Sequence, residues 1–400
     1  MMRVLHLGKY FPPHPGGVEY FLADLLPALA AQGIEVAALI HHERAGWRGL
    51  WPKGEGDLPV YRAPTLGQWL YAPLSPAFPL WLQRVIEQFK PDLLHLHLPN
   101  TSAFWALALP AARRLPWVVH WHADVVASQL DRRLRLAYTA YRPLEQALLA
   151  RTRQIIVTSP DYLDSSQPLA PWRARCTVIP LGLDPDRLAD PDPESRRLAE
   201  GLWERVRPAS IDHLQAWRVL AIGRLTYYKG HEVLIRAVAH QPEIGLLIVG
   251  AGPLARSLSH LVASLGLGGR VQLLGHQPDP LTQALLASCD LLALPSLERT
   301  EAFGLVQLEA MRFAKPVVVS DIPGSGVGWL IRQVGHGVAV APGDSIALAQ
   351  AIYSVTKDQK WLMQLGAKGK KALYKRFSID AVAKKVNYVY AKILDQAVNK

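Results

Sequence analysis

The chain has 400 residues, of which half are apolar and 19% are charged, so it is long enough for two domains and too apolar to be disordered. Lys and Arg number 44 against 33 Asp and Glu, and the net charge of +11 favours anionic partners such as nucleic acid, an acidic membrane surface or phosphorylated substrates. Two widely separated cysteines, Cys176 and Cys289, exclude a disulfide framework and indicate a reducing compartment. No apolar stretch of about 18 residues and no leader-like start are present, so we expect a cytoplasmic protein without a membrane span.

The first half of the chain shows strand-like runs that alternate with helical patterns. It opens with a short apolar run from Arg3 to Leu7, which stops at Gly8 and is followed by a loop and a helix. Alternation of this kind predicts a parallel sheet covered by helices. Further strands are predicted at residues 35–41, 92–97, 117–121, 154–159 and 177–180, and helices at residues 18–32, 77–89 and 132–151.

The second half repeats this organisation. The run from Arg218 to Arg224 resembles the run from Arg3 to Lys9, because each is apolar and ends in Gly and a cation. Two such openings predict two doubly wound domains, and we interpret the Pro- and Asp-rich stretch from Leu183 to Pro208 as their connection. Strands are predicted at residues 244–249, 271–274, 291–294, 316–320 and 338–340, and helices at residues 231–240, 254–265, 304–312 and 345–355.

The C-terminal segment, residues 378–394, has apolar residues at helical spacing and several lysines. We expect it to dock onto the folded body, with a membrane-surface role as the alternative. The predicted domains are residues 1–183 and 184–377, and residues 378–400 are expected to pack back on the first domain.

In a doubly wound sheet, ligands bind beyond the carboxyl ends of the strands. Gly16 and Gly17 precede the first helix, where small residues and free N–H groups favour close approach of an anion, although a plain tight turn remains open. Arg224 and Lys229 follow the first strand of the second domain and can converge on one anionic group, with two solvated charges as the alternative. Each charge-assisted hydrogen bond contributes about 1.5–3 kcal/mol.

Two further strand ends carry candidate residues. Gly250 and Gly252 form another Gly-rich strand end, a weaker indication than the segment from Glu301 to Met311. There Glu309 lies in an otherwise apolar helical stretch, and a buried carboxylate needs donors, which a hydroxyl-rich ligand supplies. Gly304 opens the helix, where free N–H groups can hold an anion.

Three histidines belong to the first domain's strands. His122 follows the strand 117–121 and is expected to face the interdomain cleft. His95 and His97 lie two residues apart on one strand face, and we interpret them as structural, because no cysteine pair or HExxH pattern accompanies them as a zinc site would suggest.

Taken together, these motifs resemble the retaining glycosyltransferases of family 4, which have the GT-B fold of two Rossmann-like domains facing across a cleft. The resemblance covers nearly the whole chain. Its most specific part is Glu301 to Glu309, which matches the family's Glu-x7-Glu motif. Gly223-Arg224-Leu225 with Lys229-Gly230, Ile179 to Asp184, and Pro12 to Glu19 match three further family segments in order.

The resemblance implies roles for these residues. Arg224 and Lys229 would neutralise the diphosphate of a nucleotide-sugar, Glu309 would bind its ribose, Glu301 would hold hydroxyls of the transferred sugar, and His122 would contact that sugar near the reacting carbon. The acceptor would lie mainly on the first domain, and no protein nucleophile is obvious. The remaining donor-binding residues would be Gly16, Gly17, Gly250, Gly252, Phe303, Gly304, Leu305 and Val306.

No cofactor or metal is expected, since Arg224 and Lys229 would replace a divalent ion. Asp184-Pro185-Asp186 and Asp190-Pro191-Asp192 formally match the metal-binding DxD pattern, but acidic residues are ordinary in such Pro-rich turns.

Other segments are similar to a bacterial subgroup that builds surface polysaccharides, often with mannose or rhamnose from GDP-sugars. These are Tyr227 to Gly230, His120 to Asp124 and Gly324 to Val327, whereas Leu181 and Gly328 depart from the family's usual Asn and Pro and leave the donor open. The acceptor would be either a glycan or a molecule linked to a polyprenyl lipid.

A group of arginines and aromatic residues in the first half of the chain could associate with the inner face of the plasma membrane, or the arginines could be ordinary solvated side chains. The residues considered for membrane contact are Arg132, Arg133, Arg135, Arg151, Arg153, Trp69, Tyr71, Phe78 and Trp81. The alternative functions are a nucleotide-sugar epimerase on the same fold and, less favoured because no basic helical block is present, a nucleic-acid-binding protein.

Overall fold

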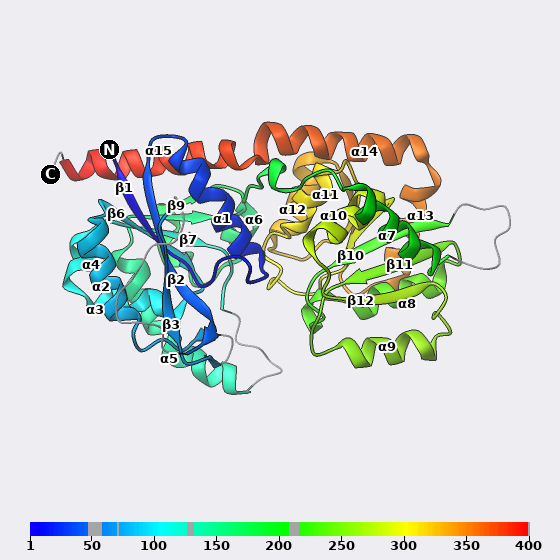
Figure 1. Ribbon diagram of the computed structural model, residues 1–400, viewed down its shortest axis with the longest axis horizontal. Helices are drawn as coiled ribbons and strands as arrows, with labels where there is room; N and C mark the ends of the chain where they lie inside the picture. Colours follow the sequence, from blue (N-terminus) through cyan, green and yellow to red (C-terminus); the bar gives the residue numbers. More distant parts are fainter. Residues whose placement is uncertain (47–57, 70–71, 126–131, 208–215, 399–400) are drawn as a thin grey trace. The chain divides into compact units, whose positions relative to one another are not determined.

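The computed structural model describes residues 1–46, 58–69, 72–125, 132–207 and 216–398. It divides the chain into two compact α/β units, each with its own parallel sheet (Figure 1). Unit 1 comprises Met1–Gly182 together with Ile379–Lys400, and unit 2 comprises Leu183–Ser378. The predicted α/β class is therefore confirmed.

The sheet of unit 1 has seven parallel strands in the order β3-β2-β1-β6-β7-β8-β9. Its central strands β1, β6 and β7 are buried on both faces, as helix-covered parallel sheets require, and combine apolar residues with buried histidines. The strands are β1 (Arg3–Leu7), β2 (Glu35–Ala45), β3 (Val60–Thr65), β6 (Leu93–Leu98), β7 (Trp117–Trp121), β8 (Gln154–Val157) and β9 (Cys176–Val178), and β4 (Gln68–Trp69) with β5 (Ala72–Pro73) forms a small antiparallel pair.

The helices of unit 1 include one from the C-terminal end of the chain. That helix, α15 (Ile379–Val398), lies beside α1 (Gly17–Ala30) in Figure 1, and Asn387 Nδ2 donates to Gln32 Oε1 at 3.1 Å. Its apolar face is buried in the unit. The other helices are α2 (Phe78–Phe89), α3 (Trp105–Ala108), α4 (Pro110–Arg114), α5 (Arg132–Arg151) and α6 (Pro160–Ser165), with 3₁₀ turns η1 (Thr101–Phe104) and η2 (Ala170–Arg175).

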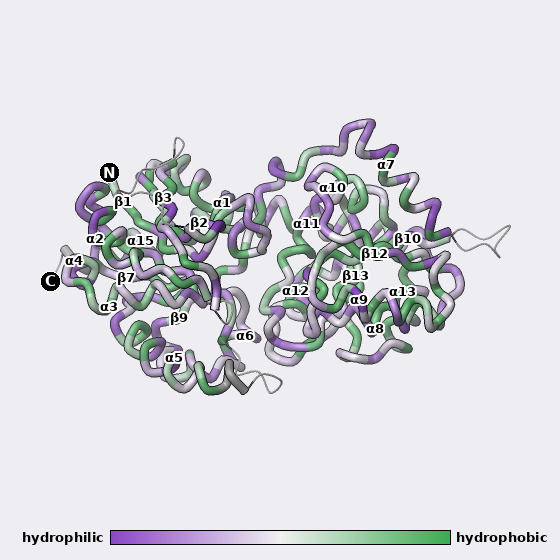
Figure 2. Tube along the Cα trace, turned by 60° about the horizontal axis from the view of Figure 1, so that its bottom comes forward, coloured by the Kyte–Doolittle hydropathy of each residue, from purple (hydrophilic) through white to green (hydrophobic). Residues whose placement is uncertain are grey.

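The sheet of unit 2 has six parallel strands in the order β12-β11-β10-β13-β14-β15. Alternate residues of β10 enter two separate cores: Val219 and Ala221 on one face of the sheet, Leu220 on the other. In Figure 2 the hydrophobic colour runs along β13, whereas hydrophilic residues interrupt α7 (Pro193–Glu204). The strands are β10 (Trp217–Ile222), β11 (Ile244–Val249), β12 (Val271–Gly275), β13 (Leu291–Leu294), β14 (Val317–Ser320) and β15 (Gly337–Val340).

Helices cover both faces of this second sheet. One face is covered by α8 (His231–His240), α9 (Ala255–Ser264) and α13 (Ser345–Lys357), and the other by α7, α10 (Asp279–Ser288), α11 (Val306–Arg312) and α12 (Gly326–Val334). The remaining elements are α14 (Gln359–Ala372), the 3₁₀ turns η3 (Pro185–Arg187) and η4 (Tyr227–Lys229), and the π-helical turn η5 (Leu373–Phe377).

Each predicted strand and helix corresponds to an element of the structure, but the interpretation of Leu183 to Pro208 as a connecting segment is wrong. This stretch contains α7, whose Trp203 packs in the core of unit 2. Asp192 caps the helix by accepting from Ser195 N at 2.9 Å, so the Pro and Asp residues mark a helix start.

Two of the aromatic residues considered for a membrane surface are also corrected. Phe78 and Trp81 are buried on α2, because they form its core-facing side. Trp69 is 60% exposed. Tyr71 and the side chains of Arg132, Arg133 and Arg135 lie outside the described residues. None of the described helices is both long and apolar enough to cross a bilayer.

Candidate functional site

Three of the predicted loops in unit 2 are neighbours. Strand β10 lies between β11 and β13 in the sheet, so the loops after these parallel strands emerge side by side at one edge. The first carries Arg224 and Lys229, the second Gly250 and Gly252, and the third the segment that starts at Glu301.

An ion pair joins the first and third of these loops. Lys229 Nζ lies 2.5 Å from Glu301 Oε2, and the two side chains are only 14% and 11% exposed. Ser296 Oγ donates to the same carboxylate oxygen at 3.1 Å. Burial lowers the pKa of Lys229, but the charge of Glu301, the nearby Tyr228 and the hydrogen bond to Glu301 outweigh it and raise the pKa overall. Lys229 is therefore a cation at neutral pH.

The backbone of η4 is attached to the end of β13. Leu297 N donates to Tyr228 O at 2.7 Å. Gly230 has φ +65°, and a Cβ there would lie 2.0 Å from Pro295 O, so only glycine allows this close approach. Arg224 is exposed, and its Nη2 donates to Tyr228 Oη at 3.1 Å.

The start of α12 holds the third loop in place through hydrogen bonds. Ser325 Oγ donates to Glu301 O at 2.5 Å, and Gly326 N donates to Ala302 O at 2.7 Å. Gly304 has φ +74° and turns the chain into the short helix α11, whose first residue is Val306. Phe303 and Leu305 are buried beside this turn. Glu309 is half-buried on α11.

Gly250 and Gly252 have a packing role in the structure. A Cβ at Gly250 would lie 1.9 Å from Gly223 O, and one at Gly252 would lie 2.5 Å from Leu225 O. Leu225 N donates to Ala251 O at 3.0 Å, which holds the two strand-end loops together. These glycines therefore position the loop of Arg224, and their contact with a donor stays a prediction.

In unit 1, the Gly16-Gly17 loop leads into the helix that covers His122. Helix α1 begins at Gly17, and the ring centroid of Phe21 on its second turn lies 5.7 Å from that of His122. His122 is 4% exposed, and its backbone N donates to Leu98 O at 3.0 Å. Phe21 thus places the helix that follows Gly16 and Gly17 against His122.

His122 belongs to a cluster that the sequence did not reveal. Its Nε2 lies 3.0 Å from His97 Nδ1, and its ring stacks 4.4 Å from that of His120. Burial, followed by the charges of His120 and His97, lowers the pKa of His122 well below its usual range, so the ring is neutral at physiological pH. The alternating pairs 95/97 and 120/122 were the available signal, because each pair occupies one strand face. His6 carried no such signal.

The aspartates of the two DxD patterns have local roles in the structure. Asp184 accepts from Asp186 N at 3.0 Å at the start of η3, and Asp192 caps α7. Asp190 pairs with Arg312 at 3.2 Å.

Two family models match the chain. The model described as glycosyl transferases group 1 matches residues 207–372 in unit 2, and the glycosyl transferase 4-like domain matches residues 16–182 in unit 1.

Curated relatives are similar over most of their length. The O-antigen chain mannosyltransferase C of Escherichia coli is 29% identical over 98% of this chain and 99% of its own. The D-rhamnosyltransferase WbpZ of Pseudomonas aeruginosa is 31% identical over 88% of this chain and 86% of its own.

Solved structures share the fold at lower identity. Sucrose-phosphate synthase from Thermosynechococcus elongatus has a TM-score of 0.77 at 22% identity, over 99% of this chain and 100% of its own. Anabaena HepE in complex with UDP-glucose has a TM-score of 0.73 at 23% identity, over 98% and 100%. With one family model on each unit and relatives that align along nearly its full length, the chain belongs to the group 1 glycosyltransferases, family 4, with the GT-B fold.

Proposed function

We propose that the protein is a retaining glycosyltransferase that moves a hexose, mannose or a related sugar, from a GDP-sugar to a glycan or lipid-linked acceptor in surface polysaccharide synthesis. Relatives at 29% and 31% identity are named as a mannosyltransferase of the O-antigen chain and a D-rhamnosyltransferase. Solved structures of HepE that share the fold hold UDP or UDP-glucose, which supports a nucleoside diphosphate sugar as the donor class.

The observation that carries the proposal is the pairing of Lys229 with Glu301 at the strand ends of unit 2, at 2.5 Å. A cation beside a carboxylate suits a donor that is an anionic diphosphate at one end and a polyhydroxylated sugar at the other. Lys229 and Arg224 are proposed to bind the diphosphate, and Glu301 the sugar hydroxyls. Glu309 is proposed to accept from the ribose.

The proposed chemistry follows from where charge develops. As the bond between the anomeric carbon and the phosphate oxygen breaks, positive charge grows on the sugar and negative charge on the diphosphate. The cations of Arg224 and Lys229 stabilise that negative charge, aided by backbone N–H groups at Gly304, Leu305 and Val306. The acceptor hydroxyl attacks from the face that the phosphate leaves, and its proton passes to the departing phosphate oxygen.

His122 is proposed to contact the transferred sugar and to orient it. Its ring is neutral at physiological pH because burial lowers the pKa, so it offers one N–H and one lone pair and no charge. Gly16 and Gly17 are proposed to approach the diphosphate through their backbone. Because two cations supply the charge, we expect turnover without added Mg²⁺ or Mn²⁺.

The proposed lipid-linked acceptor and the proposed association with a membrane surface support each other. A polyprenyl-linked acceptor sits in an anionic leaflet, and a net charge of +11 favours association with that surface.

The test is turnover of a donor panel by purified protein. GDP-mannose, GDP-D-rhamnose and UDP-glucose are supplied with and without a lipid-linked glycan acceptor, and release of the nucleoside diphosphate is measured. The anomeric configuration of the product, read by NMR, reports retention or inversion. We expect the GDP-sugars to be used with retention.

The matched variants are Lys229→Met and Lys368→Met, the latter on the exposed side of α14. Turnover should fall at least 100-fold in the first and stay unchanged in the second. Equal turnover in the two variants would remove Lys229 from the site and overturn the proposal.

A further inference from the structure

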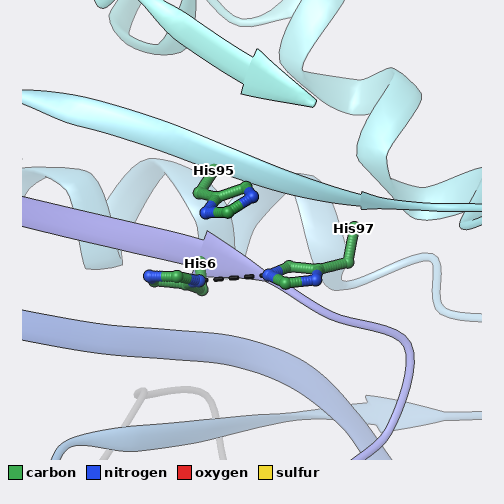
Figure 3. A group of neighbouring side chains, drawn as sticks. All are labelled: His6, His95 and His97. Atoms are coloured by element: carbon green, nitrogen blue, oxygen red, sulfur yellow. Dashed lines mark hydrogen bonds between the residues drawn. The ribbon is translucent and has the colours of Figure 1, made fainter. Parts of the chain in front are cut away.

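Five histidine side chains gather on one face of the unit 1 sheet. They come from β1 (His6), β6 (His95 and His97), β7 (His120) and the residue just after β7 (His122), and β6 pairs with both other strands. His6 is in register with His95, and His97 with His120. All five are at most 4% exposed. Figure 3 shows three of them, His6, His95 and His97, with their rings turned toward one another.

This cluster leaves polar atoms unsatisfied in the core. His6 Nε2, His95 Nε2, both ring nitrogens of His120, and His122 Nδ1 are buried and have no hydrogen-bond partner among the described residues. A buried polar group without a partner costs about 1–3 kcal/mol. An ordinary core position would carry a leucine or valine, so a buried cluster of rings with unpaired nitrogens points to a ligand bound within the cluster.

We propose that His6, His95 and His97 bind a zinc ion. One ring nitrogen from each residue lies within 4.8 Å of one from each of the others. His6 Nδ1 and His97 Nε2 are 3.1 Å apart (Figure 3, dashed line). Zinc–nitrogen bonds of about 2.0–2.1 Å in a tetrahedron place two nitrogens about 3.3 Å apart, so these two atoms already have the required spacing.

Ring orientation distinguishes this trio from the alternative trio of His97, His120 and His122. A histidine lone pair lies in the plane of its ring, so rings that share an ion need planes that intersect near it. In the alternative trio the planes of His120 and His122 differ by only 3°, and those of His97 from His120 and His122 by 16° and 13°, so the lone pairs lie in nearly parallel planes. In the proposed trio the planes differ by 40° (His6 and His95), 28° (His6 and His97) and 21° (His95 and His97).

A second layer of contacts orients the proposed ligands. Tyr390 of α15 places its hydroxyl 2.5 Å from His95 Nδ1, which leaves Nε2 without a hydrogen-bond partner in the part of the chain that the structure describes. His97 Nδ1 lies 3.0 Å from His122 Nε2. Zinc-bound histidines usually donate the second ring N–H to such a partner, which fixes the tautomer.

The chemistry of the ligand set selects the class of ion. Three imidazole nitrogens suit zinc and other borderline transition metals, whereas magnesium and calcium require oxygen ligands. Three protein ligands leave the fourth tetrahedral position to an oxygen. Such an ion would join β1 and β6 beneath α15, apart from the donor-binding residues of unit 2, and the inference does not rest on the proposed function.

The experiment uses full-length protein without a polyhistidine tag, stripped of metal and returned to a metal-free buffer. Zinc is added, and bound metal is counted by elemental analysis after gel filtration. We expect one zinc per chain and a higher melting temperature, with no effect of Mg²⁺ or Ca²⁺. Cobalt(II) should bind at the same site and give the visible absorption bands of a tetrahedral ion with nitrogen ligands.

Variants locate the ion. His6→Gln and His95→Gln should each abolish the stoichiometric site, whereas His120→Gln, equally buried in the same cluster, should keep it. Tyr390→Phe removes the contact with His95 and should weaken zinc affinity about 10–100-fold.

Two results would overturn the inference, and the first needs no variant. One is wild-type protein that binds no zinc and shows no cobalt absorption in the visible range. The other is loss of the ion in His120→Gln with retention in His6→Gln, which would place it at the alternative trio. Neither result bears on donor turnover, so the proposed function is tested separately.

Discussion

Gly230 joins the lysine of the proposed donor site to the sheet through a contact that only glycine permits. It has φ +65°, and a Cβ would lie 2.0 Å from Pro295 O. Gly266 has nearly the same backbone angle, φ +66°, but no atom lies within 4 Å of its Cβ position. Substituting alanine at the two glycines therefore distinguishes the free-energy cost of left-handed backbone, which applies to both, from the cost of a steric collision, which applies only to Gly230.

We predict that Gly266→Ala lowers the free energy of unfolding by about 1–2 kcal/mol, the cost of left-handed backbone. Gly230→Ala should lower it by about 1–3 kcal/mol more, because the methyl group collides with a backbone carbonyl. Urea denaturation of both variants measures the difference. Equal losses would mean that η4 does not pack against the end of β13 as described.

Lys229 and Glu301 contribute to stability as a pair. Removing one partner of a nearly buried ion pair leaves an uncompensated charge, at a cost of about 3 kcal/mol. Lys229→Met should therefore destabilise unit 2 by about that amount, and adding Glu301→Gln should recover most of the loss. A double variant as unstable as Lys229→Met alone would show that the two side chains do not interact.

At the scale of elements, the strands were predictable and several helices were not. The run from Ile244 to Val249 has no polar residue and includes three β-branched residues, which is typical of a strand buried on both faces. The helices α10, α12 and α14 were missed, as was β3. The helix α7 was missed because its capping Asp192 and Pro193 were interpreted as part of a linker.

The candidate site also has one part that the sequence predicted and one part that it did not. The sequence singled out Lys229 and Glu301 in two separate motifs that follow neighbouring strands, and the structure adds that their side chains form an ion pair. The sequence did not reveal the histidine cluster, because β1 (Arg3–Leu7) and β6 (Leu93–Leu98) are far apart in sequence and meet only in the sheet. Tyr390 joins that cluster from the far end of the chain.

The helix α15 belongs to unit 1 through its apolar face, which includes Val386 at 0% exposed. We predict that Val386→Ala lowers the free energy of unfolding by about 2 kcal/mol, because it leaves a cavity between α15 and the rest of the unit. Lys385→Ala, next in the chain and exposed, should change stability by less than about 0.5 kcal/mol. Chemical denaturation followed by fluorescence tests both, and a similar small effect of the two substitutions would argue against docking of this face.

At the scale of the whole molecule, buried histidines make folding sensitive to acid. Burial lowers the pKa of His336 to about 3 and, with the charge of Lys229, that of His231 to about 4. Burial also lowers the pKa of His41 to about 4. These rings stay neutral in the folded chain, whereas in the unfolded chain they take up protons below the ordinary value of 6.5. Stability is therefore full above that pH and declines as pH falls toward the folded values.

For His336 alone, the free energy of unfolding should fall by about 1.4 kcal/mol for each pH unit below 6.5. We predict that His336→Leu removes this share and makes the dependence of unfolding free energy on pH shallower between pH 4.5 and 6.5 than in the wild type. Denaturant unfolding at a series of pH values gives the two slopes, and parallel slopes would contradict the neutral, buried state of this ring.

The account depends most on the strand-end loops of unit 2 as the site that takes the diphosphate. Arg224 tests this directly, because it is exposed. The measurement is calorimetric binding of GDP and UDP to wild type, to Arg224→Met and to Arg236→Met, an exposed arginine on α8. For the nucleotide that the wild type binds, Arg224→Met should weaken affinity about 10–100-fold, while Arg236→Met should bind as the wild type does. Unchanged affinity in Arg224→Met would show that the diphosphate binds elsewhere.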